Sequence, residues 1–186
     1  MKKAQRGFGL IEVLVTIVLT AIGILGVVAM QGKSIQFTQQ AVNQNTAALL
    51  AADLMESLRA SRHELYDAHT RLKADSDYFK QPGEDFANAE IGCPDTSTEC
   101  PLAQLQAWKT RVQQQLPSVT GDLLKNDYHI CISKTEGNCY ADGDDEDERG
   151  SAIEIQLAWT GNHEECAKPN EDSKKDVCYY TLRAEI

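Results

Sequence analysis

The first third of this sequence lacks proline and cysteine, and its most apolar part is almost without charge. None of the five prolines comes before Pro82, and none of the six cysteines lies in this part. Proline in a helix interior costs roughly 3 kcal/mol or more, so nothing forces a helix to break before the polar stretch at residues 66–77. Between Phe8 and Met30 the only charged residue is Glu12. These absences predict a long, uninterrupted helix with one acid near its start.

The sequence also lacks the motifs of common enzymes. It contains no Gly-x-Ser-x-Gly nucleophile motif and no glycine-rich phosphate-binding loop. Its cysteines are expected to be paired, which leaves no free thiolate for catalysis. We therefore predict that the protein is not an enzyme and needs no cofactor.

The sequence has fewer basic residues than acidic ones. The chain has 18 Lys and Arg against 28 Asp and Glu, for a formal net charge of −10. Loss of the three basic residues at the N-terminus would take the charge to −13. Nucleic-acid sites need a clustered basic surface, whereas the positive charges here are scattered. Direct binding of nucleic acid is therefore not expected.

The apolar run from Phe8 to Met30 is long enough to cross a membrane, which takes about 18 or more apolar residues. A secretory signal would have a shorter apolar region followed by an Ala-x-Ala site, and no such site follows here. The residues before the run include three basic ones, Lys2, Lys3 and Arg6. The positive-inside rule places that end in the cytoplasm. We expect residues 8–30 to be a retained transmembrane helix and the chain after Gln31 to be exported.

Glu12 is the unusual residue of this segment. An acid deep in a membrane helix costs roughly 2.5–3.5 kcal/mol, which points to a function and to a partner. Cleavage between Gly7 and Phe8 would create an α-amino group that could pair with Glu12 in the same chain or in a neighbour. Alternatively, Glu12 lies in the first helical turn, where the helix dipole favours it and water reaches it. The sequence alone leaves both interpretations open.

Residues 31–65 are predicted to continue the helix. One apolar residue recurs every seven positions at Ile35, Val42 and Leu49, and a stripe continues, slightly displaced, at Met55, Leu58 and Leu65. We expect the second half to pack against a globular domain. The first half is rich in small and polar residues, which favour close contacts between the helices of different subunits.

The six cysteines all follow the apolar run, in the part expected to be exported. An even number in an oxidising compartment predicts three disulfides, for which 15 connectivities are possible. Short polar loops between neighbours favour Cys93 with Cys100, Cys131 with Cys139 and Cys166 with Cys178. Zinc is the rival interpretation, but close Cys-x-x-Cys or Cys/His spacings are absent. Ligand spacing is also absent among the histidines, and we predict no metal site; these histidines are His63, His69, His129 and His163.

An α+β layout is predicted for residues 66–186, the globular domain. A helix from Pro101 to Pro117 has one apolar face, made of Leu102, Leu105, Trp108, Val112 and Leu116. The period then changes to two, which predicts antiparallel strands at residues 128–132, 152–159 and 177–183. The alternation at residues 153–159 predicts one buried sheet face, packed against the long helix.

The acidic run at residues 142–148 lies between the first two of these strands. Its alternate acids are similar to the start of a calcium loop, but the central glycine and the closing glutamate are misplaced. A solvated hairpin loop is the better interpretation, and calcium remains an alternative.

Residues 7–15, Gly-Phe-Gly-Leu-Ile-Glu-Val-Leu-Val, resemble the processing site and first helix of the type IV pilin and pseudopilin superfamily. Residues 31–39 and 45–56 resemble, more narrowly, the minor pilins known as type IV pilus modification proteins. The resemblance implies a leader peptide at residues 1–7, cleavage by a prepilin peptidase after Gly7 and methylation of Phe8. It also implies that Glu12 aligns a subunit with its neighbour's amine.

The resemblance implies a minor pilin that assembles into or primes a type IV pilus, in support of twitching motility and adhesion. Its partners would be other minor pilins, the major pilin, the prepilin peptidase and the pilus assembly platform. It would lie in the bacterial inner membrane with a periplasmic domain, and later in the surface pilus, near its tip. A minor pseudopilin of a type II secretion system is the alternative.

Overall fold

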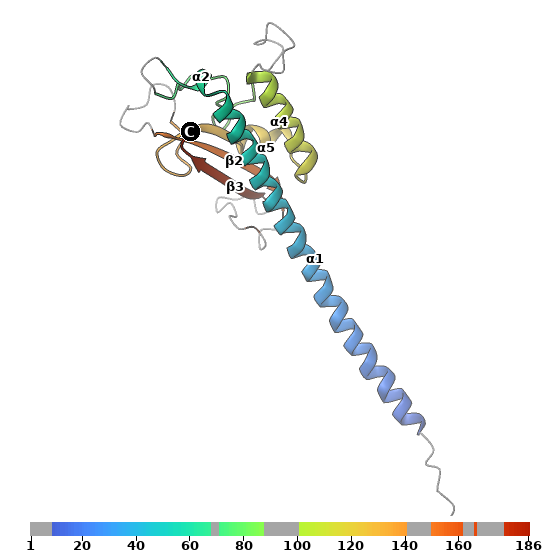
Figure 1. Cartoon of the computed structure of the whole chain (residues 1–186). Helices are drawn as coiled ribbons and strands as arrows, with labels where there is room; N and C mark the ends of the chain where they lie inside the picture. The colour runs from blue at the N-terminus through green and yellow to red at the C-terminus, as the bar shows by residue number, and fades with distance from the viewer. Residues whose placement is uncertain (1–8, 68–70, 88–100, 141–149, 162–165, 167–176) are drawn as a thin grey trace, which may run out of the picture. The chain divides into compact units, whose positions relative to one another are not determined.

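The computed structural model of the protein (Figure 1) describes residues 9–67, 71–87, 101–140, 150–161, 166 and 177–186. Its contacts divide the chain into two compact units, Met1–Gln39 and Gln40–Ile186, called unit 1 and unit 2 below. Each unit is described by itself.

Unit 1 consists, in its described residues, of the first part of one helix. The helix α1 extends from Leu10 to Ala60 and so continues into unit 2. Every described residue of unit 1 is exposed. This segment therefore has an apolar surface without a core of its own.

Unit 2 combines helices with a small sheet. After α1, its helices are α2 (Arg62–Leu65), α4 (Pro101–Gln115) and α5 (Gly121–Asn126). The strands β1 (His129–Ser133), β2 (Ala152–Thr160) and β3 (Val177–Ala184) form an antiparallel sheet in the order β1-β2-β3. In the register, Cys131 faces Glu154 on β2, and Glu154 faces Arg183 on β3.

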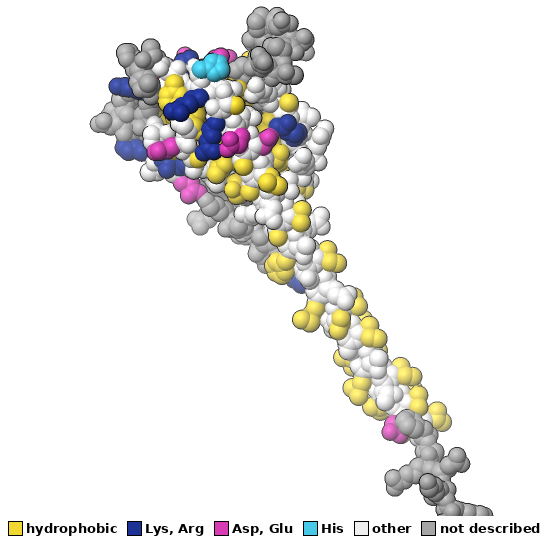
Figure 2. Space-filling model, viewed as in Figure 1, with side chains coloured by type: hydrophobic (Ala, Val, Ile, Leu, Met, Phe, Trp, Pro, Cys, Tyr) yellow, Lys and Arg dark blue, Asp and Glu magenta, His cyan; other side chains and the backbone are white. Residues whose placement is uncertain are grey.

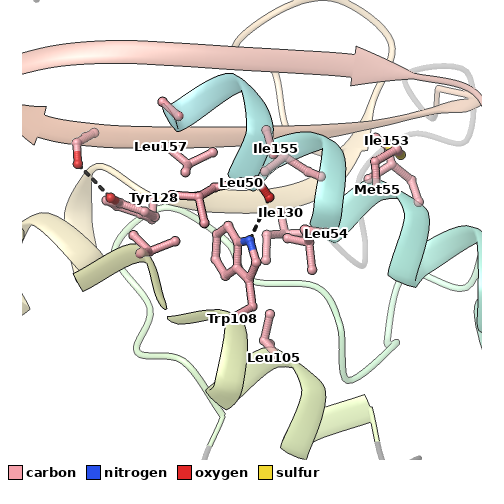
Figure 3. Close-up of a cluster of buried hydrophobic side chains, with 14 of the residues drawn as sticks. Leu50, Leu54, Met55, Leu105, Trp108, Tyr128, Ile130, Ile153, Ile155 and Leu157 are labelled. Atoms are coloured by element: carbon pink, nitrogen blue, oxygen red, sulfur yellow. Dashed lines mark hydrogen bonds between the residues drawn. The ribbon is translucent and has the colours of Figure 1, made fainter. Parts of the chain in front are cut away.

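The core of unit 2 lies between one face of the sheet and two helices (Figure 3). Leu50, Leu54 and Met55 of α1 meet side chains of α4 and of the sheet. The sheet residues labelled there are Ile130, Ile153, Ile155 and Leu157. Trp108 of α4 is buried, and its Nε1 donates to the Leu50 carbonyl at 2.8 Å. This hydrogen bond joins α4 to α1 inside the core.

The predicted α+β architecture is confirmed: a long helix packs on a small antiparallel sheet. The helix with one apolar face is α4, and its predicted core residues are all buried, namely Leu102, Leu105, Trp108, Val112 and Leu116. The three predicted strands are β1, β2 and β3, with bounds that differ by one residue. The sequence pattern did not predict α5, which Thr120 caps by accepting a hydrogen bond from the Leu123 N–H.

Two details of the prediction were wrong. Leu49 was expected to join the stripe that packs on the domain, but this residue is 72% exposed. The buried stripe of α1 instead comprises Ala47, Leu50, Ala51, Leu54, Met55 and Leu58. The sheet was expected to bury one face, but Glu154 on the other face is fully buried as well.

Two disulfides lie among the described residues. Cys131 is joined to Cys139, eight residues along the chain, and Cys166 to Cys178, twelve residues along. Both pairs belong to the sequential scheme, whereas Cys93 and Cys100 lie outside the described residues. Each short cross-link is expected to stabilise unit 2 by roughly 2–3 kcal/mol, because it reduces the entropy of the unfolded chain.

Candidate assembly site

Glu12 lies in the first turn of α1. Its backbone N–H donates to the Gly9 carbonyl at 3.0 Å, and its side chain is exposed. It is the only charged residue from Leu10 to Gly32. A carboxylate in the first turn interacts favourably with the positive end of the helix dipole. The predicted assembly residue therefore stands alone at the start of an apolar helix.

The helix that carries Glu12 has a mostly apolar surface. An 18-residue window of α1 has a mean hydropathy of 2.7, and none of this window is buried in the chain. On the face shown in Figure 2, apolar side chains line this helix, whereas charged ones gather over unit 2. The hydroxyls of Thr16 and Thr20 donate back to the carbonyls of Val13 and Thr16. By length and composition, this helix can cross a membrane.

Three glycines of α1 leave free space beside the helix backbone. A Cβ added at Gly23, Gly26 or Gly32 would meet nothing within 4 Å. No contact within the chain therefore requires glycine at these positions. Small residues of this kind let two helices approach closely.

A second cluster lies in unit 2, on the sheet face opposite the core. The buried Glu154 carboxylate accepts from His129 Nε2 at 2.9 Å, from Ser133 Oγ at 3.0 Å and from the Gly137 N–H at 2.8 Å. Burial by itself would raise the pKa of Glu154. The hydrogen bonds from His129, Gly137 and Ser133 outweigh it, and the pKa lies below its usual range. Glu154 is therefore an ionised, fully bonded acid in the interior.

The same cluster groups possible metal ligands that linear spacing did not reveal. A ring nitrogen of His129 and the sulfurs of Cys131 and Cys139 lie within 4.8 Å of one another. The two sulfurs are bonded to each other, so neither is a thiolate ligand in this state. His129 and Cys131 share a face because they are two residues apart on a strand. The sequence predicted sequential disulfides and no metal site, and it did not indicate that His129 lies beside Cys131 and Cys139.

Lys80 is a further buried charge of unit 2. Its Nζ donates to the carbonyls of Gln81, Lys125 and Tyr128 at 3.1, 2.9 and 2.7 Å. Its backbone exchanges two hydrogen bonds with Ile130 on β1. Burial lowers the pKa of Lys80 to about 8, against the opposing influence of Glu84 and Asp85. Lys80 therefore joins its own segment to the edge strand β1 and to the residues just before that strand.

Several predicted residues fall outside the described part of the chain. Gly7 and Phe8, the predicted processing residues, lie there, as do Cys93, Cys100 and the acidic run at residues 142–148. Among the described residues, Glu12 is far along the sequence from the cluster at Glu154, and the two belong to different units. The candidate assembly site is therefore confined to unit 1.

Comparison with models of known protein families gives a match at the N-terminus. The family described as the prokaryotic N-terminal methylation motif matches residues 2–28. No curated protein and no solved structure matched the chain.

The motif and the exposed apolar helix together indicate a type IV pilin-like or pseudopilin protein. Proteins of this kind are structural and are not enzymes. They are anchored in a membrane by the N-terminal helix, and in general they interact with other pilins and with a prepilin peptidase.

Proposed function

We propose that the protein is a minor pilin of a type IV pilus, which assembles into or primes the fibre and so supports twitching motility and adhesion. One observation carries the proposal: the methylation motif at residues 2–28 leads into a helix on which every described residue up to Gln39 is exposed. The resemblance of residues 31–39 and 45–56 to the minor pilin PilV favours a pilus over a secretion complex. The acidic net charge argues against direct contact of this subunit with nucleic acid.

In this proposal, processing prepares the N-terminus for assembly. Residues 1–7 are a leader, which a prepilin peptidase removes by cleavage after Gly7, and Phe8 becomes the methylated N-terminus. Residues 8–30 hold the protein in the inner membrane, and residues 31–65 continue the helix. The globular domain at residues 66–186 lies in the periplasm before assembly, and in the pilus, near its tip, afterwards.

Glu12 then guides the assembly step. A carboxylate in hydrocarbon costs roughly 2.5–3.5 kcal/mol unless a cation accompanies it. The methylated amine of a neighbouring subunit supplies that cation, and pairing of opposite charges offsets the cost in a medium of low dielectric constant. The exposure of Glu12 in the first turn of α1 leaves its carboxylate available for such a pair.

The apolar surface of α1 forms the remaining contacts in this proposal. Other minor pilins and the major pilin pack against it, and Gly23, Gly26 and Gly32 allow close approach, since a Cβ there meets nothing in the chain itself. The pilus assembly platform would extract the helix from the membrane into the fibre.

Deletion of the gene distinguishes this function from that of a minor pseudopilin. We expect fewer surface pili and normal secretion of extracellular enzymes, measured by electron microscopy and by enzyme activity in the medium. Restoration by a plasmid copy is the control. Normal piliation with lost secretion would contradict the proposal and identify a type II secretion subunit instead.

A further inference from the structure

The sheet face opposite the core brings together a cysteine pair, a histidine and an acid, none of which the proposed assembly function uses. A ring nitrogen of His129 lies within 4.8 Å of the sulfurs of Cys131 and Cys139, and its Nε2 is 2.9 Å from Glu154 Oε1. We propose that His129, oriented by Glu154, is a general base that deprotonates the thiols of Cys131 and Cys139 and so speeds closure of their disulfide.

In the reduced chain the cluster would hold two thiols, an imidazole whose ring nitrogen lies within 4.8 Å of both sulfurs, and a carboxylate that orients the imidazole. These are the parts from which an activated nucleophile is built. When Nε2–H donates to a carboxylate, Nδ1 keeps the lone pair that can accept a proton. The imidazolium that results is stabilised by Glu154, which is already ionised. Only the thiolate attacks a disulfide, and an ordinary thiol of pKa about 8.5 is only about 3% ionised at pH 7. A base at this place therefore has a large effect on rate.

The surroundings hold the base and its acid in a fixed geometry. The Glu154 carboxylate also accepts from Ser133 Oγ and the Gly137 N–H, so it fastens the loop that carries Cys139. On β3, Arg183 faces Glu154 in the register, and its Nη2 donates to the carbonyls of Ser133 and Lys134. The other charged side chains nearest in the chain are Lys134 and Glu136 on the loop and Asp127, which accepts from Tyr179.

Exposure assigns different parts to the two thiols. Cys139 is half-buried, whereas Cys131 is fully buried. The Cys139 thiolate attacks the disulfide of an exported thiol–disulfide oxidoreductase, forms a mixed disulfide and releases one sulfur of the oxidant as a thiolate. The Cys131 proton passes to His129, and the Cys131 thiolate attacks Cys139 Sγ and expels the second sulfur. Two electrons pass to the oxidant, which leaves as a dithiol with the two thiol protons.

Faster closure also serves correct pairing. Six cysteines allow 15 connectivities, and a pair that closes first removes two cysteines from the wrong combinations. The cluster would thus direct the oxidative folding of unit 2 before the subunit is assembled.

The test follows disulfide closure in the reduced full-length chain in detergent, reoxidised with glutathione disulfide at pH 7 and at pH 9.5. Timed alkylation and peptide mass spectrometry give the rate for each pair. We expect His129→Gln to close Cys131–Cys139 at least about 10-fold more slowly at pH 7. At pH 9.5 thiols ionise without a base, and the two rates are expected to agree within about twofold. Closure of Cys166–Cys178 in the same sample is the internal control and should not change.

Two results would overturn the proposal. One is an unchanged rate in His129→Gln at pH 7, and the other is an equal slowing at both pH values, which would indicate a positional role only. A second measurement uses the chain without any substitution, so its outcome does not depend on whether a variant folds. The alkylation rate of Cys139 in the reduced protein is expected to rise with an inflection well below pH 8.5, and an inflection at the ordinary thiol value would exclude activation by His129.

Discussion

Residues 10–39 and residues 40–60 belong to the same helix, yet only the second segment buries side chains. Leu50 and Leu54 in unit 2 are 4% and 1% exposed, whereas Ile17 and Ile24 in unit 1 are 60% and 58% exposed. The first segment is the more apolar of the two. Its sequence is therefore suited to surroundings that the chain itself does not supply.

The comparison separates two sources of stability. In unit 2, burial of apolar surface is worth about 25 cal/mol per Å² and comes from the chain's own sheet and helices. In unit 1, the same gain is available only from lipid or from other helices. Substitutions in unit 2 should therefore change folding, and substitutions in unit 1 should change assembly.

The largest effect is expected from a pair of adjacent leucines on α1. Leu50→Ala should lower the free energy of unfolding of unit 2 by about 2–5 kcal/mol, because it leaves a cavity in the core. Leu49→Ala is the matched control, since Leu49 is 72% exposed, and should change it by no more than about 0.5 kcal/mol. Denaturant unfolding in detergent, followed by tryptophan fluorescence, measures both. An equal loss of unfolding free energy in both variants would contradict the claim that only one face of α1 packs in the core.

A pair of glycines gives the next largest effect. Gly83 in unit 2 has φ of +85°, so Gly83→Ala should cost about 1–2 kcal/mol of unfolding free energy. Gly26 lies in the middle of α1, where alanine is favoured over glycine by about 0.5–1 kcal/mol. Gly26→Ala should therefore not lower the free energy of unfolding. The added Cβ should instead hinder the close approach of neighbouring helices and so reduce the number of pili. A lower free energy of unfolding together with normal piliation in Gly26→Ala would assign Gly26 to folding and contradict its role in assembly.

The smallest effect is a dependence of stability on pH that belongs to unit 2. The pKa of Lys80 is about 8 in the folded chain against an ordinary value of 10.5, so between these values the unfolded chain binds more protons. Stability should thus rise as the pH increases from 8 to 9.5, and this contribution is lost as the pH falls through 8. The slope should stay below about 1.4 kcal/mol per pH unit, the limit for one proton.

Lys80→Met is the comparison variant for this prediction. It removes the titrating group, so the rise between pH 8 and 9.5 should disappear even if the variant is less stable overall. Urea unfolding at each pH gives the slope. The same slope in Lys80→Met would assign the proton uptake to another group.

The sequence predicted those elements in which local pattern and tertiary contact agree. In α4 apolar residues recur with a period of 3.6, and in β2 with a period of two. In both elements these apolar residues are the ones that the fold buries. The short helix α5 was missed although Thr120 is a favourable N-cap residue, because its six residues are too few to show a period.

The remainder depended on contacts between distant residues. Alternation along β2 placed Glu154 on a solvated face, but His129, Ser133 and the loop at Gly137 cover it. Likewise Leu49 has the spacing of a packed residue, and only the position of the sheet shows that it points away from the core. Glu12, in contrast, could be singled out from the sequence because a lone acid in an apolar run is unusual in itself.

The most direct test of the account is Glu12→Ala, scored for both processing and piliation. Mass spectrometry should show normal cleavage after Gly7 and methylation of Phe8, while electron microscopy should show that most surface pili are lost. Glu56→Ala, an exposed acid on the unit 2 part of α1, is the control and should leave both unchanged. Normal pilus numbers in a correctly processed Glu12→Ala protein would contradict the claim that unit 1 is an assembly surface guided by this acid.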